Sequence, residues 1–68
     1  MTVRETYTVA GMTCGHCVQA VTDELIRLPG IHDVRVDLTT GTVTVESDGQ
    51  VPFDEVRAAV DEAGYALA

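Results

Sequence analysis

The sequence contains no lysine, and its four cations are all arginines. Asp and Glu together number 11, so the formal net charge is -7 at pH 7. Such a chain would repel a phosphate backbone, and we therefore expect no nucleic-acid partner. The first interpretation of this acidity is that it keeps a small protein soluble, and the second is that it steers the protein toward a basic partner.

The sequence also lacks a long apolar run. No stretch approaches the roughly 18 consecutive apolar residues of a membrane span, and the first five residues have neither the basic nor the apolar region of a signal peptide. We therefore expect no membrane insertion and a cytoplasmic location. The 68 residues are expected to form a single domain, residues 1–68, which is too small to enclose both a core and a large catalytic pocket. No enzyme activity and no catalytic residue are assigned.

Alternating apolar and polar residues predict three strands. The first covers residues 3–9, with Glu5 as an exception to the pattern. The second and third form a hairpin across residues 39–41. The apolar members of this hairpin are Val34, Val36, Leu38, Val43 and Val45. Residues 65–68 are able to add a short last strand.

Apolar residues three or four positions apart predict two helices. The apolar stripe of the first is Val18, Val21, Leu25 and Leu28, and that of the second is Phe53, Val56, Val60 and Ala63. Pro29 and Gly30 end the first helix, whereas Pro52 suits the first turn of the second helix and Gly64 ends it. The order βαββαβ predicts an α+β, ferredoxin-like sandwich, in which a four-stranded antiparallel sheet carries both helices on one face.

Strand direction in this fold places three connections at one end of the sheet. They are residues 10–16, residues 39–41 and residues 64–65. His32, at the start of the second strand, is expected at the opposite end and on the surface.

Cys14 lies in the glycine-containing loop 10–16, and Cys17 directly follows this loop, where the first helix begins. In a reducing compartment such a pair is more often a metal or redox site than a structural disulfide. The helix N-terminus stabilises thiolates. Two soft sulfurs favour copper(I), because structural zinc takes four donors. A pair on a loop also remains open to an incoming thiolate, which favours a carrier over a store.

The segment Gly-Met-Thr-Cys-Gly-His-Cys at residues 11–17 follows a predicted strand. Together with Pro29-Gly30 and Ala63-Gly64-Tyr65, it resembles the heavy-metal-associated domain, and more narrowly the bacterial copper chaperones of the CopZ type. This resemblance covers essentially the whole chain. It implies transfer of copper(I) to the metal-binding domain of a copper-transporting P-type ATPase or to a copper-responsive repressor. Whether two copies also form a homodimer bridged by copper at high loading stays open.

The resemblance also implies roles for individual residues. Cys14 and Cys17 would bind the metal, Met12 would turn inward to anchor the loop, and Tyr65 would lie beside the site. Zinc- and cadmium-handling relatives often have an acidic residue before the first cysteine, and Thr13 at that position favours copper.

Several alternatives stay open at this point. His16 is interpreted as a residue that tunes the thiolates, as a solvated loop residue, or as a weak ligand. Met12 and Tyr65 also fit core positions. The chain as a whole could be a metal-binding domain excised from a copper-transporting ATPase or a mercury-resistance protein, or an enzyme of dithiol exchange.

Overall fold

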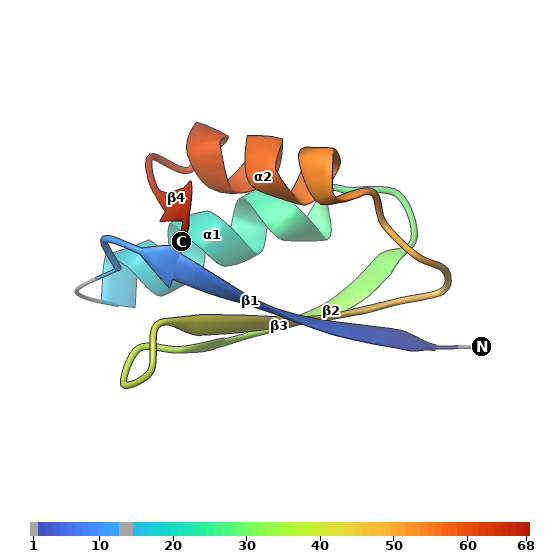
Figure 1. The fold of residues 1–68 in the computed structure, drawn as a ribbon, viewed down its shortest axis with the longest axis horizontal. Coiled ribbons are helices and arrows are strands. Elements are labelled where there is room, and N and C mark those ends of the chain that lie inside the picture. Colours follow the sequence, from blue (N-terminus) through green and yellow to red (C-terminus); the bar gives the residue numbers. More distant parts are fainter. Residues whose placement is uncertain (1, 13–14) are drawn as a thin grey trace.

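A computed structural model describes residues 2–12 and 15–68. Its elements are β1 (Val3–Ala10), α1 (Gly15–Ile26), β2 (Ile31–Asp37), β3 (Thr42–Ser47), α2 (Phe53–Glu62) and β4 (Ala66–Leu67). The strands form one antiparallel sheet in the order β2-β3-β1-β4, and both helices lie on the same side of it (Figure 1). The predicted ferredoxin-like sandwich is confirmed. None of the helices in these described residues has the length and apolar character needed to cross a membrane.

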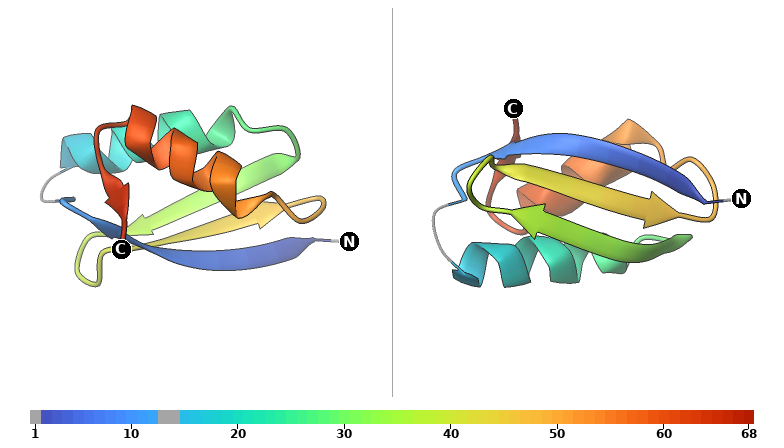
Figure 2. Two further views of the ribbon diagram at one scale, coloured as in Figure 1. Left: turned by 45° about the horizontal axis from the view of Figure 1, so that its top comes forward. Right: turned by 90° about the horizontal axis from the view of Figure 1, so that it is seen from below.

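Burial alternates along the strands and separates the two faces of the sheet. Val43 and Val45 of β3 are 0% and 2% exposed and belong to the core. Thr44, between them, is paired with Thr6 of β1, and their hydroxyl oxygens are 3.4 Å apart. The right-hand view of Figure 2 shows the sheet from this polar side, with α2 behind the strands and α1 alongside β2. The apolar face of the sheet therefore packs against the helices, as the alternation predicts.

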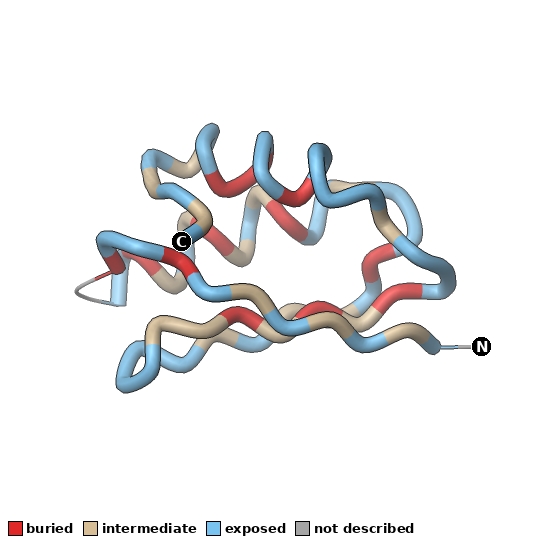
Figure 3. The backbone as a smooth tube through the Cα atoms, in the orientation of Figure 1, coloured by how far each residue is buried: buried red, intermediate tan, exposed pale blue. Residues whose placement is uncertain are grey.

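The core lies between the helices and the sheet (Figure 3). Its helical members are Cys17, Val21 and Leu25 of α1 and Val56, Ala59 and Val60 of α2. These residues recur three or four positions apart, so each helix presents one apolar stripe to the sheet. Burying each valine or leucine of this set contributes roughly 1.5–3 kcal/mol, which makes this layer the main source of stability in so short a chain.

The boundaries of the first loop and first helix differ from the prediction. Ala10 still belongs to β1 and Gly15 already begins α1, so the loop is shorter than residues 10–16. At its other end α1 stops at Ile26, before the predicted Leu28. Leu28 precedes Pro29, whose ring disfavours helical backbone in the preceding residue. Its side chain nevertheless packs against the core.

Two apolar side chains assigned to the buried pattern are exposed. Leu38 lies beyond β2 in the turn and is 40% exposed. Phe53 begins α2 and is 55% exposed. Its ring lies against Tyr7, with ring centroids 6.2 Å apart. Phe53 is exposed because β4 pairs with just Val9 and Ala10, which leaves the sheet narrow where α2 begins.

One end of the fold gathers the three connections that strand direction predicts. The backbone N–H of Val9 donates to the carbonyl of Gly41 at 2.8 Å, which ties the end of β1 to the β2–β3 turn. Ala10 pairs with Ala66 of β4, which brings the α2–β4 connection to the same place. Because α1 begins here as well, we call this the Cys17 end of the fold.

The burial pattern predicts unequal effects of two leucine truncations. Leu25 is fully buried, so Leu25→Ala should lower the free energy of unfolding by about 2–5 kcal/mol. Leu38→Ala, at an exposed turn position, should change it by at most about 0.5 kcal/mol. Urea unfolding followed by circular dichroism measures both. Similar losses in the two variants would contradict the burial assigned here.

Candidate metal site

The predicted site residues come from three segments at the Cys17 end. Thr13 and Cys14 lie outside the described residues. Met12 follows β1, and His16 and Cys17 are in the first turn of α1. The last predicted member, Tyr65, precedes β4 and is far from the others in sequence.

The end of α2 directs Tyr65 toward this site. The N–H of Gly64 donates to the carbonyl of Asp61 at 3.0 Å, and the N–H of Tyr65 donates to the carbonyl of Val60 at 3.1 Å. This is the Schellman pattern, which requires a left-handed residue after the helix, and Gly64 has φ of +96°. The chain therefore turns sharply and carries Tyr65 back toward the sheet.

The Tyr65 side chain connects two sides of the site. Its hydroxyl donates a hydrogen bond to the Cys17 sulfur at 2.9 Å. Its ring passes close to Gly11, where a Cβ would lie 3.5 Å from Tyr65 Cδ1. Gly11 itself has φ of +90°, which other residues rarely adopt. The ring thus spans the space between the residue that follows β1 and the first turn of α1.

The Cys17 sulfur lies in surroundings that favour negative charge. Cys17 is 3% exposed and belongs to the core, but it is also in the first turn of α1. Backbone N–H groups at a helix N-terminus lack helical partners and carry partial positive charge. No acidic residue is present in the first turn of α1. The amide groups and the Tyr65 hydroxyl together can therefore stabilise a thiolate, the form of cysteine that binds metals.

The remaining predicted residues differ in exposure. Met12 is 9% exposed and belongs to the hydrophobic core. His16 is exposed, although it is next to Cys17 in sequence. His32 lies at the opposite end of the fold, where its Nε2 is 3.6 Å from a carboxylate oxygen of Asp48. The structure thus brings Cys17, Tyr65 and Gly11 together. The contact of Gly11 with the Tyr65 ring was not predicted from the sequence.

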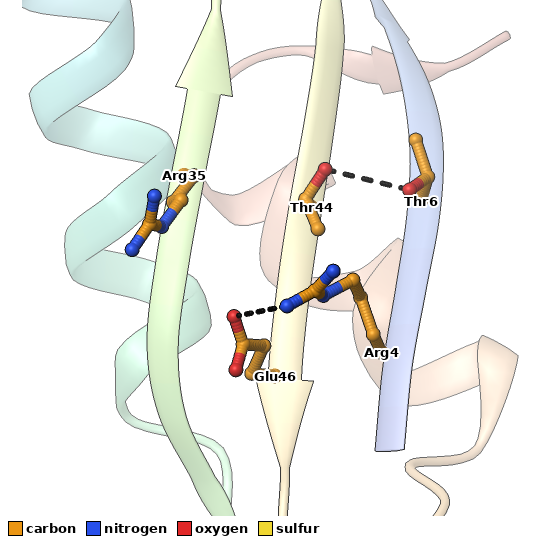
Figure 4. A pocket seen from close by; sticks show the side chains of 5 residues that line it. All are labelled: Arg4, Thr6, Arg35, Thr44 and Glu46. Atoms are coloured by element: carbon orange, nitrogen blue, oxygen red, sulfur yellow. Dashed lines mark hydrogen bonds and ion pairs between the residues drawn. The ribbon is translucent and has the colours of Figure 1, made fainter. Parts of the chain in front are cut away.

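A shallow hollow on the polar side of the sheet lies away from these residues. It is lined by Arg4, Thr6, Arg35, Thr44 and Glu46 (Figure 4). Sequence analysis did not predict it, although the polar positions of the alternating strands mark its location. Arg4 pairs with Glu46 at 3.4 Å, and Arg35 pairs with a neighbouring carboxylate at 3.1 Å. With its charges neutralised locally and no sulfur among its lining residues, this hollow is not a candidate for a soft metal.

Several known proteins are similar to this chain in sequence and in fold. The model of the heavy-metal-associated domain matches residues 6–66. The copper chaperone CopZ of Staphylococcus epidermidis is 40% identical over 58 residues, which cover 84% of this chain and 85% of that protein. A solved structure of a CopZ metallochaperone is 33% identical, with a TM-score of 0.90, and the match covers 97% of this chain and 100% of the other.

A much larger relative contains a similar segment. Copper-transporting ATPase 2 of Rhizobium meliloti is 36% identical over 64 residues, which cover 94% of this chain but 8% of the ATPase. The same unit thus occurs in relatives of very different length. Since the family model matches most of the sequence and the fold agrees throughout, the chain belongs to the heavy-metal-associated domain family.

Proposed function

We propose that this chain is a cytoplasmic copper(I) chaperone, a single domain over residues 1–68 without catalytic activity. It binds one copper(I) ion through Cys14 and Cys17 and passes the ion to a partner by thiolate ligand exchange. The observation that carries the proposal is the position of the Cys17 sulfur, in the first turn of α1 and hydrogen-bonded to Tyr65. This arrangement supplies a stabilised thiolate next to the segment that contains the second cysteine.

Copper(I) is the metal that this donor set suits best. Thiolates are soft ligands and select soft ions, whereas a structural zinc site takes four donors. The names of the CopZ relatives and of the ATPase relative also specify copper. A two-cysteine site leaves room for one more thiolate, so an incoming cysteine can bind before a resident cysteine leaves. Tight binding and rapid transfer are then compatible.

The other site residues support the two ligands. Met12, buried in the core, anchors the start of the loop. The exposed side chain of His16 adjusts the charge around the metal. Thr13 stands in the sequence where an acidic residue would favour zinc or cadmium, so its identity favours copper. The reduced state that both thiols need is maintained in the cytoplasm. The proposed acceptor is the metal-binding domain of a copper-transporting P-type ATPase, and a copper-responsive repressor or a second copy bridged by copper would use the same ligands.

A second candidate function follows from the ATPase relative. The match to a segment that makes up 8% of that protein means that this chain could also serve as the metal-binding domain of a longer transporter. Metal binding by the two cysteines would be identical in that case, but the ion would pass to a transport site in the same polypeptide. Sequencing of the transcript around this reading frame distinguishes the two functions.

Serine substitutions test the ligand assignment. Reduced protein titrated anaerobically with copper(I) against a calibrated competing chelator should bind one equivalent. Cys14→Ser and Cys17→Ser should each weaken binding by at least about a hundredfold, because a hydroxyl is a poor ligand for a soft ion. Zinc(II) should not displace the copper(I). Binding that survives the loss of either cysteine would exclude the two-thiolate site.

The Tyr65 hydrogen bond should affect metal affinity in a pH-dependent way. A donor to sulfur stabilises the ionised, metal-bound sulfur more than the neutral thiol. Tyr65→Phe should therefore raise the copper(I) Kd by about fivefold at pH 6, where binding must displace protons, which corresponds to roughly 1 kcal/mol. The difference should shrink as the pH is raised, because fewer protons then have to be displaced on binding.

Tyr7→Phe is the matched control for this experiment. Tyr7 lies farther along β1, against Phe53, and removal of its hydroxyl should leave the Kd unchanged at pH 6 and at higher pH. If Tyr65→Phe and Tyr7→Phe gave the same Kd at pH 6, the hydrogen bond to Cys17 would have no part in binding.

A further inference from the structure

One border of the sheet is open along most of β1. The short strand β4 pairs with the last two residues of β1, and the N–H of Ala68 donates to the carbonyl of Thr8 at 2.9 Å. In the part of the chain that the structure describes, no strand lies beside the earlier residues of β1 on this side. They form the border of the sheet in the right-hand view of Figure 2. We call residues 3–7 the open edge.

The backbone groups that face outward at the open edge follow from the antiparallel ladder. In a strand, the N–H and C=O groups of successive residues point to opposite neighbours. The N–H of Val9 points toward the β2–β3 turn, where it bonds to Gly41, whereas the carbonyl of Thr8 points toward β4. The N–H and C=O groups of Arg4 and Thr6 therefore point to the open side. A row of such groups is a template on which another strand can add.

The opposite border of the sheet is protected by its backbone and by a helix. The pairing of β2 is irregular between Ile31 and Asp33, and α1 lies alongside β2 (Figure 2). Bulges and covering helices both prevent an edge strand from pairing with another chain. By contrast, β1 pairs with β3 without a register shift from Val3 to Thr8 and contains no proline. Protection of the open edge therefore depends on its side chains.

The middle of the open edge has an inward-facing charge. Glu5 is half-buried and pairs with Val45, which is 2% exposed, so its side chain is on the face of the sheet that bears the helices. No ion pair in residues 2–12 and 15–68 includes it. Burial and the nearby Glu5 carboxylate raise the pKa of Tyr7, on the same face. The stability of the domain does not account for a carboxylate at this position.

We infer that the open edge is a self-pairing surface and that Glu5 prevents it from binding a second copy of this chain. In the antiparallel arrangement that uses the whole edge, Val3 lies opposite Tyr7 of the second copy, and Arg4 lies opposite Thr6. Glu5 then lies opposite its own equivalent. Side chains in such positions have Cβ atoms about 4.5–5.5 Å apart, and like charges there are destabilising. On a half-buried face the repulsion is stronger than in water.

Neighbouring registers do not avoid this conflict. A shift of one residue would place the polar face of one copy beside the apolar face of the other. A shift of two residues in one direction places Arg4 opposite its own equivalent. A shift in the other direction requires the carbonyl of Thr8, which already accepts the N–H of Ala68. The register with Glu5 at its centre is therefore the one that a second copy would adopt.

The apolar side chains beside Glu5 favour the association that Glu5 opposes. Val3 and Tyr7 are half-buried, and Phe53, which is 55% exposed, lies against Tyr7. Pairing would bring Val3 of the second copy next to Tyr7 and remove apolar surface from water. An inward-facing charge is a known means of preventing such contacts between edge strands. Glu5 thus keeps the protein monomeric.

Glu5→Val tests the inference, with Glu62→Val as its matched control. Both variants lose one carboxylate and gain one valine, but Glu62 is exposed at the end of α2. Sedimentation equilibrium of reduced, metal-free protein measures self-association without links through cysteine or metal. Glu5→Val should dimerise with a Kd at least about tenfold lower than that of the wild type, because a valine pair replaces a carboxylate pair. Glu62→Val should behave as the wild type does.

Two further measurements locate the contact. Addition of Thr6→Pro to Glu5→Val should restore the monomer, because proline removes an outward N–H and leaves the ladder to β3 intact. Amide hydrogen exchange of Glu5→Val gives a readout that does not depend on the stability of the proline variant. The N–H groups of Arg4 and Thr6 should become protected as the protein concentration rises.

Three results would overturn the inference. Glu5→Val could associate no more strongly than the wild type, or Glu5→Val and Glu62→Val could associate equally. Dimers of Glu5→Val in which the N–H groups of Arg4 and Thr6 exchange as fast as in the monomer would show that the second copy binds elsewhere.

Discussion

The hydrogen bond between the Tyr65 hydroxyl and the Cys17 sulfur depends on almost every element of the fold. Cys17 is held by α1, which is positioned by its stripe of buried residues against β2. Tyr65 is held by the end of α2 and by the pairing of β4 with β1. A hydroxyl and a sulfur separated by 48 positions in sequence meet because β1 and α2 end, and α1 and β4 begin, at the same place. The site therefore requires the folded core.

Much of this arrangement is present in the sequence pattern. The alternation at Val43 and Val45 predicts which face of β3 is buried, and Gly64 after an apolar stripe predicts the end of α2. Strand direction then places Tyr65 beside the loop. The hydrogen bond itself could not be predicted in this way, because it depends on the side-chain torsions of Tyr65 and Cys17, which periodicity does not specify.

The errors have physical causes that act over long distances in the sequence. Phe53 fits the stripe of α2, yet it is exposed because β4 is too short to extend the sheet beneath it. Leu38 continues the alternation of β2, but the turn begins one residue earlier. For Phe53 the local pattern was correct about the helix and wrong about burial, because burial is determined by what lies opposite; for Leu38 the pattern extended the strand one residue too far.

Because the Schellman turn at Gly64 follows α2 directly, the position of Tyr65 depends on the length of α2. One extra residue in α2 would advance its end by about 1.5 Å and rotate it by about 100°, and the hydroxyl would then point away from Cys17. The connection at residues 48–52, at the other end of the fold, has no such constraint. Among homologues, insertions and deletions should therefore accumulate before α2, while the number of residues from Val56 to Tyr65 stays constant.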